Sequence, residues 1–319
     1  MSVWKTFPRR IGSVWIAVIA LYLFSGLASP AMLTLHQLLN VLQVAAFLGV
    51  VSLGETFALL VAGIDLSVAG VVTMTNILAT AFMGGPGGSI ALGVAVPLAV
   101  AAIVGVINGL LVAIVDITPL IATLGSNAVL YGGALLYTGG APHGGTRPGF
   151  AVLGQGSVGG LPASMLIWFA IALACTVLLR HTVYGRRLYA IGANARAARF
   201  TGIAVKPILI SAYVASSLLA AMGGLLLTAY IGQPALGIGD QFLFTSIAAV
   251  VVGGTALTGG VGGVGGTVGG ALLITELNSV TDILRVSTGV QYLVQGTIIA
   301  LSVLLYRSID RARRTRETT

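Results

Sequence analysis

Long, continuous apolar stretches dominate this chain and are separated by short polar segments. A membrane-spanning helix needs about 20 mostly apolar residues, whereas the strands of a membrane barrel alternate apolar and polar positions. The stretches here do not alternate, so we expect helices. Ten stretches qualify, near residues 11–28, 38–62, 67–84, 89–115, 120–138, 162–180, 207–231, 241–257, 266–281 and 290–306. The pattern predicts an all-α, polytopic membrane protein with a single transmembrane domain over residues 1–319.

Basic residues gather in three short segments that flank the apolar stretches. Fourteen of the sixteen lysines and arginines lie within residues 1–10, 180–206 and 307–319. Cytoplasmic loops of membrane proteins carry an excess of lysine and arginine. With ten spans and a cytoplasmic N-terminus, the sixth span ends at Arg180 and the tenth at Arg307, which places all three segments inside. We therefore expect both termini, the tails 1–10 and 307–319, to be cytoplasmic; eight or twelve spans are the alternatives.

The composition agrees with a membrane protein and changes the meaning of the net charge. Hydrophobic residues make up 57% of the chain and charged residues 8%, with a mean hydropathy of +1.03. A soluble domain carries roughly a quarter charged residues. The net charge of +8 could suggest nucleic acid. Because the basic residues flank apolar stretches, we expect contact with membrane lipid and no nucleic acid.

No cluster with catalytic or metal-binding spacing stands out in the sequence. Cys175 is the single cysteine, and the three histidines, His36, His143 and His181, are far apart. A phosphate-binding P-loop needs a lysine after a glycine, and neither lysine follows one. We therefore predict no catalytic residue, no metal and no cofactor, and expect any ATP hydrolysis to occur on another protein.

A polar string, Gly63-Ile64-Asp65-Leu66-Ser67, interrupts the apolar sequence before the third predicted span. A carboxylate at the bilayer centre costs about 2.5–3.5 kcal/mol, so something must compensate for Asp65. One reading is a capped turn between two helices. The other, compatible with it, is a broken helix that lines a pathway or gate.

Further polar residues lie inside the predicted spans. Such groups face the bundle interior, where they either hold neighbouring helices together or line a path for an uncharged, hydroxyl-rich solute. Our candidates for the substrate pathway or gate are Asp65, Ser67, Asn76, Asn108, Thr123 and Asn127.

Glycines with four-residue spacing mark expected close contacts between helices. Gly105 and Gly109 form such a pair in the fourth predicted span, and ten of the eighteen residues from Gly253 to Gly270 are glycine. A flexible linker would be more polar. We expect two helix ends packed closely on their neighbours and joined by a tight turn there.

The loop 181–206 has the pattern of a short surface helix. Asn194 is a suitable N-cap, residues 195–200 are good helix formers with two arginines, and Gly202 is a stop signal. Such a helix either contacts acidic lipid or forms a docking site for a cytoplasmic partner.

Three strings in this chain resemble those of the ribose/xylose-type ABC sugar permeases. Residues 62–70 read A-G-I-D-L-S-V-A-G, where that family has G-G-I-D-L-S-V-G. Residues 185–203 resemble its main cytoplasmic loop, and residues 248–260 resemble its A-A-V-V-x-G-G-T-x-L-x-G-G string. The likeness extends over nearly the whole chain from the second predicted span onward.

The resemblance implies a multi-pass permease of the bacterial inner membrane. It implies a pair of permease subunits, identical or not, docked on two ATPase subunits, with a periplasmic or lipid-anchored protein that delivers the sugar. It also implies that the loop 181–206 couples to the ATPase. The residues that match the coupling loop of the family are Gly185, Arg186, Gly192, Asn194, Ala197, Ala198 and Gly202.

The chain departs from that pattern at three places, which bear on the substrate. Ala62 replaces a glycine, Glu55 stands where the family commonly has an uncharged residue, and residues 243–246 lack the carboxylates of an E-L-D-A stretch. A branched-chain amino-acid permease is the nearest alternative. A stand-alone secondary transporter would use ion coupling and no ATPase, and a membrane-embedded enzyme or scaffold would need a catalytic cluster.

Overall fold

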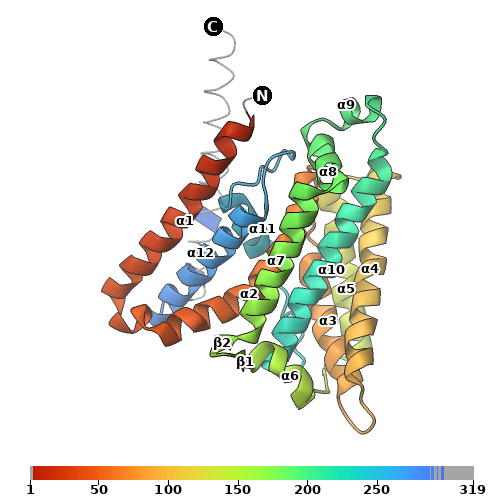
Figure 1. The fold of residues 1–319 in the computed structure, drawn as a ribbon. Helices are drawn as coiled ribbons and strands as arrows, with labels where there is room; N and C mark the ends of the chain where they lie inside the picture. The colour runs from red at the N-terminus through yellow and green to blue at the C-terminus, as the bar shows by residue number, and fades with distance from the viewer. Residues whose placement is uncertain (1–2, 288, 291–292, 294–295, 298–319) are drawn as a thin grey trace.

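The computed structural model describes residues 3–287, 289–290, 293 and 296–297. These residues form a bundle of helices with one short hairpin (Figure 1). The predicted span 290–306 and the tail 307–319 lie largely or wholly outside the described residues, so the count of ten spans stays a prediction.

Most of the long helices match the predicted spans closely. The first half contains α1 (Val3–Ala28), the short 3-10 helix η1 (Pro30–Leu33), α2 (Leu35–Leu60), α3 (Val68–Met83), α4 (Ile90–Ala113) and α5 (Pro119–Thr138). The second half contains α7 (Ala163–His181), α10 (Val205–Ile231), α11 (Phe242–Val252) and α12 (Val264–Ile283). Five of them, α2, α4, α5, α7 and α10, are long and apolar enough to cross a membrane, and Gly12–Leu27, α3 and α11 are shorter apolar helices.

Smaller elements close the two ends of the bundle. At one end lie α8 (Val183–Ala193) and α9 (Ala195–Phe200), and at the other end lie α6 (Pro148–Gln155) and a hairpin (Figure 1). The hairpin pairs β1 (Ser157–Val158) with β2 (Leu161–Pro162) in antiparallel fashion. Apart from these two strands, the described chain is helical, as the apolar pattern predicts.

The expected continuous span at 241–257 is wrong. Helix α11 has 11 residues and rises only about 16 Å, which is too short for a hydrocarbon core of about 30 Å. It ends at Gly253, and Gly254 has a φ of +91°, a conformation that favours glycine. A Cβ atom at Gly253 would lie 2.3 Å from the Gly266 carbonyl oxygen, so the backbone of α12 packs directly on this turn. Close packing, rather than helix length, decides the shape of the glycine segment.

Helix α10 lies at the centre of the bundle and packs against α2, α3 and α4. A Cβ atom at Gly105 would lie 2.6 Å from the Cα of Val214, and one at Gly109 would lie 2.6 Å from the Cα of Ile210. The predicted glycine pair thus lets α4 approach α10 backbone to backbone. Helix α1 lies at one side of the bundle and packs against α12 (Figure 1).

Candidate functional site

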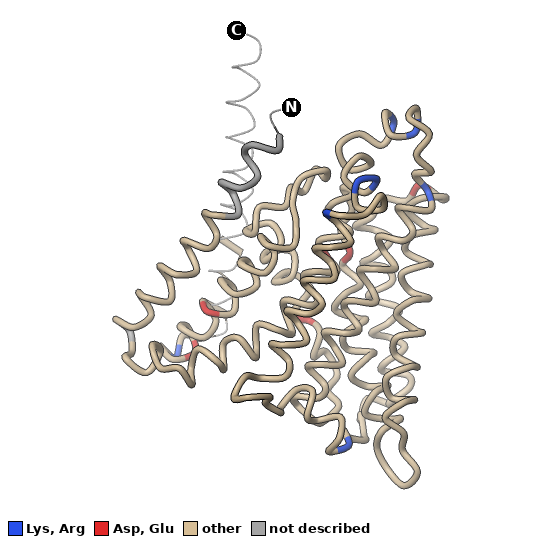
Figure 2. Tube along the Cα trace, viewed as in Figure 1, with Lys and Arg blue, Asp and Glu red and all other residues tan. Residues whose placement is uncertain are grey.

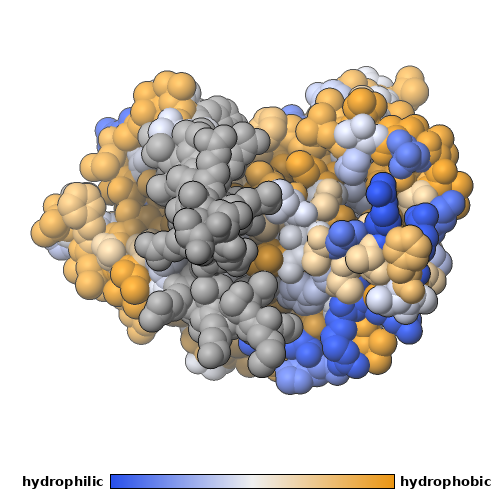
Figure 3. Space-filling model, turned by 90° about the horizontal axis from the view of Figure 1, so that it is seen from above, coloured by the Kyte–Doolittle hydropathy of each residue, from blue (hydrophilic) through white to orange (hydrophobic). Residues whose placement is uncertain are grey.

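Positive charge gathers at the end of the bundle formed by α8 and α9. Lysines and arginines cluster there in the tube view (Figure 2), and hydrophilic side chains cover the same side from above (Figure 3). Asn194 Oδ1 accepts a hydrogen bond of 3.0 Å from the Ala197 amide, and Gly202 has a φ of +83°. The predicted cap, short helix and stop are confirmed.

The predicted coupling residues divide into an exposed set and a buried set. Arg186, Asn194, Ala197 and Gly202 are exposed, whereas Gly185, Gly192 and Ala198 are buried against the bundle. Sequence reasoning missed Phe200, whose side chain is 86% exposed at the end of α9. An exposed aromatic ring next to Arg199, in a basic segment, fits a surface that another molecule covers.

Helix α8 is anchored to three other parts of the chain. Tyr184 Oη lies 2.9 Å from Ser211 Oγ of α10, and Tyr189 Oη donates a 2.9 Å hydrogen bond to the Gly262 carbonyl. Burial raises the pKa of Tyr189, which keeps its hydroxyl protonated and able to donate. Gly192 abuts the last turn of α2, because a Cβ atom there would lie 1.8 Å from the Leu60 carbonyl oxygen. The same oxygen accepts a 3.0 Å bond from the Gly260 amide.

The turn 61–67 between α2 and α3 gathers five of the six predicted pathway residues. Asp65 Oδ1 accepts the Ser67 amide at 3.0 Å, and Asn108 Nδ2 of α4 donates to Ser67 Oγ at 2.9 Å. From α5, Thr123 Oγ1 accepts the Leu66 amide at 3.0 Å and Asn127 Oδ1 accepts the Gly70 amide at 2.7 Å. These side chains fix the broken helix to α4 and α5. The capping oxygen comes from Asp65 and not from Ser67, because the N-cap Ser67 makes no side-chain cap bond.

Asn76 lies apart from that turn and holds a different irregular segment. Its amide nitrogen donates to the Gln233 carbonyl at 3.1 Å, and its amide oxygen accepts the Ala235 amide at 2.8 Å. Thr73 Oγ1 also accepts the Gly239 amide at 3.0 Å. Side chains of α3 therefore supply hydrogen-bond partners to the backbone of residues 233–239. This segment connects α10 to the short helix α11.

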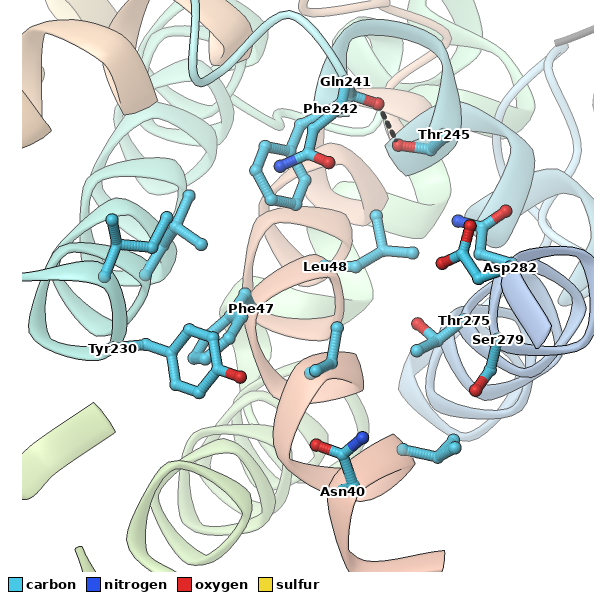
Figure 4. Close-up of a pocket in the computed structure, with 15 residues that line it drawn as sticks. Asn40, Phe47, Leu48, Tyr230, Gln241, Phe242, Thr245, Thr275, Ser279 and Asp282 are labelled. Carbon is cyan, nitrogen blue, oxygen red and sulfur yellow. Dashed lines mark hydrogen bonds between the residues drawn. The ribbon is translucent and has the colours of Figure 1, made fainter. Parts of the chain in front are cut away.

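A cavity of about 370 Å³ opens between α2, α10, α11 and α12 (Figure 4). It lies at the first half of α2, the end of α10, the start of α11 and the end of α12, away from the α8 contact at Leu60. Its polar lining residues are Asn40, Tyr230, Gln241, Thr245, Thr275, Asn278, Ser279 and Asp282. The rings of Phe47 and Tyr230 stand 5.2 Å apart at the same wall. None of the predicted pathway residues lines this cavity.

One sequence signal could have indicated the cavity. Gln241 and Thr245 are four residues apart, as are Thr275 and Ser279, so each pair falls on one helix face. The two pairs flank the glycine segment. Their meeting across α11 and α12 depends on the tertiary fold.

Comparison with known proteins decides the family. Residues 37–303 match the family described as the permease component of branched-chain amino acid transport systems. The chain belongs to this permease family. It is a non-catalytic transport subunit and a multi-pass membrane permease of a bacterial ABC importer.

Three curated relatives match this permease over nearly their full length. The ribose import permease RbsC of Bacillus subtilis is 35% identical over 303 residues, covering 92% of this chain and 91% of the relative. A probable ABC transporter permease of Sinorhizobium fredii is 35% identical over 302 residues, covering 94% and 89%. The galactose/methyl galactoside import permease MglC of Escherichia coli is 31% identical over 312 residues, covering 92% and 93%. No solved structure matches the chain significantly.

Proposed function

We propose that this permease translocates a pentose or hexose sugar into the cell. The lining of the cavity carries this proposal. It offers hydroxyl and amide groups, the carboxylate of Asp282 and an aromatic wall, and no lysine or arginine is among the described residues that line it. A branched-chain amino acid carries a carboxylate that needs a cationic partner when buried. A sugar needs only hydrogen-bond partners for its hydroxyl groups and an apolar face, which this lining supplies.

The relatives support a sugar over an amino acid in spite of the family description. RbsC is a ribose importer and MglC a galactose importer by name, and both match nearly the whole chain. The family description refers to branched-chain amino acids and fits a broader group. We therefore infer a sugar substrate for two reasons. The named relatives are sugar import permeases, and the described lining of the cavity contains no lysine or arginine.

A permease of an ABC importer works with an ATPase and a solute-binding protein. We propose that α8, α9 and Phe200 dock on the ATPase in the cytoplasm. The cavity then opens in the outer half of the membrane, where a periplasmic or lipid-anchored protein delivers the sugar. Ten membrane crossings in one domain, with both termini inside, and pairing with a second permease subunit complete this proposal. The crossing expected at 241–257 is then made by the short helix α11 together with the irregular segment before it. The basic end of α8 and α9 supports the orientation.

The contacts of α8 suggest how ATPase movement reaches the cavity. Helix α8 abuts Leu60 at the end of α2 and the loop 253–263 that leads into α12. The last turns of α2 and the first turn of α12 are joined by a 2.7 Å hydrogen bond between Thr56 Oγ1 and Thr267 Oγ1. Both helices continue to the cavity. A shift of α8 would therefore move two of the four cavity walls together.

Uptake by the reconstituted complex tests the proposed function. Vesicles holding the permease, its ATPase and its binding protein should take up ribose or galactose when ATP is supplied, and vanadate should stop the uptake. Leucine, measured in the same vesicles, should not accumulate. Preferred uptake of leucine, or sugar uptake driven by an ion gradient without the ATPase, would contradict the proposal.

Thr275→Val should weaken sugar recognition in the cavity. The substitution keeps the side-chain shape and removes the hydroxyl that faces the cavity in Figure 4. One neutral hydrogen bond contributes about 0.5–1.5 kcal/mol, so the KM for uptake should rise roughly two- to tenfold. Thr176→Val is the matched control, because the Thr176 hydroxyl bonds to the Ala172 carbonyl within α7, away from the cavity. An equal rise in the control would assign the effect to the helices and not to the sugar.

A further inference from the structure

Two carboxylates meet in the interior of the bundle, below the turn 61–67. Glu55 of α2 and Asp65 of the turn are both 0% exposed. Glu55 Oε1 accepts a 3.2 Å hydrogen bond from the Asp65 amide, so the Glu55 carboxylate lies next to the backbone of Asp65. Sugar transport as proposed above gives Glu55 no role, and its side chain does not line the cavity.

Each carboxylate keeps one oxygen without a partner, and two hydroxyl groups at the same place lack partners as well. Glu55 Oε2 and Asp65 Oδ2 are buried and accept no hydrogen bond from the described residues. Tyr213 Oη and Ser216 Oγ, one turn apart on α10, are buried and equally without a hydrogen bond. The Ser216 hydroxyl is directed at the Asp65 carboxylate. The Tyr213 hydroxyl is close enough to both carboxylates to interact with them electrostatically. Buried polar atoms in proteins rarely lack a hydrogen-bond partner. The four unpartnered oxygens therefore indicate a further species that binds among them.

No cation of the described chain neutralises the pair. The charged group acting on Glu55 is Asp65, and Tyr213 of α10 is the further titratable side chain that faces both acids among the described residues. The contacts from α4 and α5 to the turn are made by neutral Asn108, Thr123 and Asn127. Two ionised carboxylates on neighbouring residues of the fold, away from water, repel each other and lose solvation. A positive species must therefore bind here.

The packing leaves room for a proton and not for a metal ion with its ligands. A Cβ atom at Gly63 would lie 2.3 Å from Tyr213 Oη and 3.2 Å from the Ala58 carbonyl oxygen. Gly63 of the turn therefore packs directly against the Tyr213 hydroxyl, and not even a methyl group would fit between them. A sodium ion would need several oxygen ligands around it at this packed turn, whereas a proton needs only one buried carboxylate oxygen.

We propose that Glu55 and Asp65 together bind one proton inside the membrane. The proton resides on one of the two carboxyl groups and leaves the pair one negative charge, close to the Ser67 amide and to the hydroxyl groups of Ser216 and Tyr213. Since Asp65 caps the broken helix and its amide bonds to Glu55, the proton also holds the turn 61–67 against α2. Loss of the proton leaves two neighbouring like charges and loosens the turn. The permease therefore has a proton-binding site that makes its stability and its import activity depend on pH.

Infrared spectra of the purified transport complex test this site without reference to the sugar. At neutral pH the wild-type complex should show a carbonyl band of a protonated carboxylic acid that shifts in heavy water. Glu55→Gln should remove that band, because glutamine keeps the Asp65 contact and donates from its amide without a titratable proton. The matched control is Asp116→Asn, an exposed acid in the loop after α4, and it should leave the band unchanged. Glu276 is a third buried acid with an unpartnered oxygen, so the decisive signal is the difference between the wild-type and Glu55→Gln spectra. A difference spectrum without the band of a protonated carboxylic acid would overturn the proposal.

Thermal unfolding of the same complexes provides a second readout. The folded wild-type protein holds one proton more than the unfolded chain at neutral pH, so stability should fall as pH rises. The folded-to-unfolded ratio should drop by up to about tenfold for each pH unit between the pKa of these acids in the unfolded chain and the pH at which the folded site loses its proton, and it should level off above that pH. Glu55→Gln should flatten this dependence, and Asp65→Asn should do the same if the first variant does not assemble. Stabilisation by sodium at constant pH, or an unchanged pH dependence in an assembled variant, would refute a bound proton.

Discussion

The Gly192→Ala permease should lose more than nine-tenths of its ATP-driven uptake while still assembling with its ATPase. The new Cβ atom would lie 1.8 Å from the Leu60 carbonyl oxygen and 2.4 Å from the Gly260 amide nitrogen, where real contacts stay above 3.0 Å. Both obstacles are backbone atoms, so α8 must move away from α2 and from the loop 253–263. The exposed residues of α8 and α9 are not altered, and docking should survive.

Uptake and ATP hydrolysis, measured side by side in vesicles, distinguish this result from simple misfolding. We expect the variant complex to hydrolyse ATP without moving sugar, because the docking surface is intact and its contact with the two helices is not. Gly132→Ala is the matched control, since a Cβ atom there meets no heavy atom within 4 Å. Normal uptake by Gly192→Ala would show that the Gly192–Leu60 contact does not transmit movement.

Gly105→Val should prevent α4 from packing on α10 and destabilise the whole bundle. A Cβ atom at Gly105 would lie 2.6 Å from the Cα of Val214 and 2.8 Å from the Tyr213 carbonyl oxygen. Overpacking costs about 1–3 kcal/mol where side chains can adjust, and here the obstacle is the backbone of the central helix, so the cost should exceed that range. The contact between α4 and α10 is the most extensive between any two described helices, which leaves no other place to absorb the shift.

Thermal unfolding midpoints and yields in detergent measure this effect. The Gly105→Val protein should unfold at a much lower temperature than the parent or fail to accumulate. Gly125→Val in α5 places the same side chain on another helix, in open space, and should change the midpoint little. Equal loss in both variants would mean that valine disfavours these helices in general and that the close approach of α4 to α10 is unimportant.

Local patterns predicted much of the fold. The ends of α3, α5, α7 and α9 fall within a residue or two of the predicted bounds, since apolar runs, caps and glycine stops act over short distances. The same reasoning failed for α11. Its composition is that of a span, but the turn at Gly253 and Gly254 is fixed by the backbone of α12, which no local pattern reveals.

The candidate site was only partly accessible to sequence reasoning. The short helix 195–200, which we propose docks on the ATPase, could be predicted because its cap, its helix formers and its glycine stop are local signals. The polar residues inside spans were noticed, but their roles could not be separated, because a buried amide favours a neighbouring helix and a cavity equally. Asn108 and Thr123 bind the turn 61–67, whereas Thr275 and Gln241 face the cavity.

The sequence by itself determined that this is a membrane protein, which residues form most of its helices and which segments of the chain are basic. Those properties depend on hydrophobicity and charge, which are sums over neighbouring residues. The tertiary structure alone decided that α8 abuts Leu60, that four helices enclose a cavity without lysine or arginine in its described lining, and that the Glu55 carboxylate meets the Asp65 backbone. Each of these depends on which distant residues come within a few ångströms, because steric contact and hydrogen bonding act only at that range.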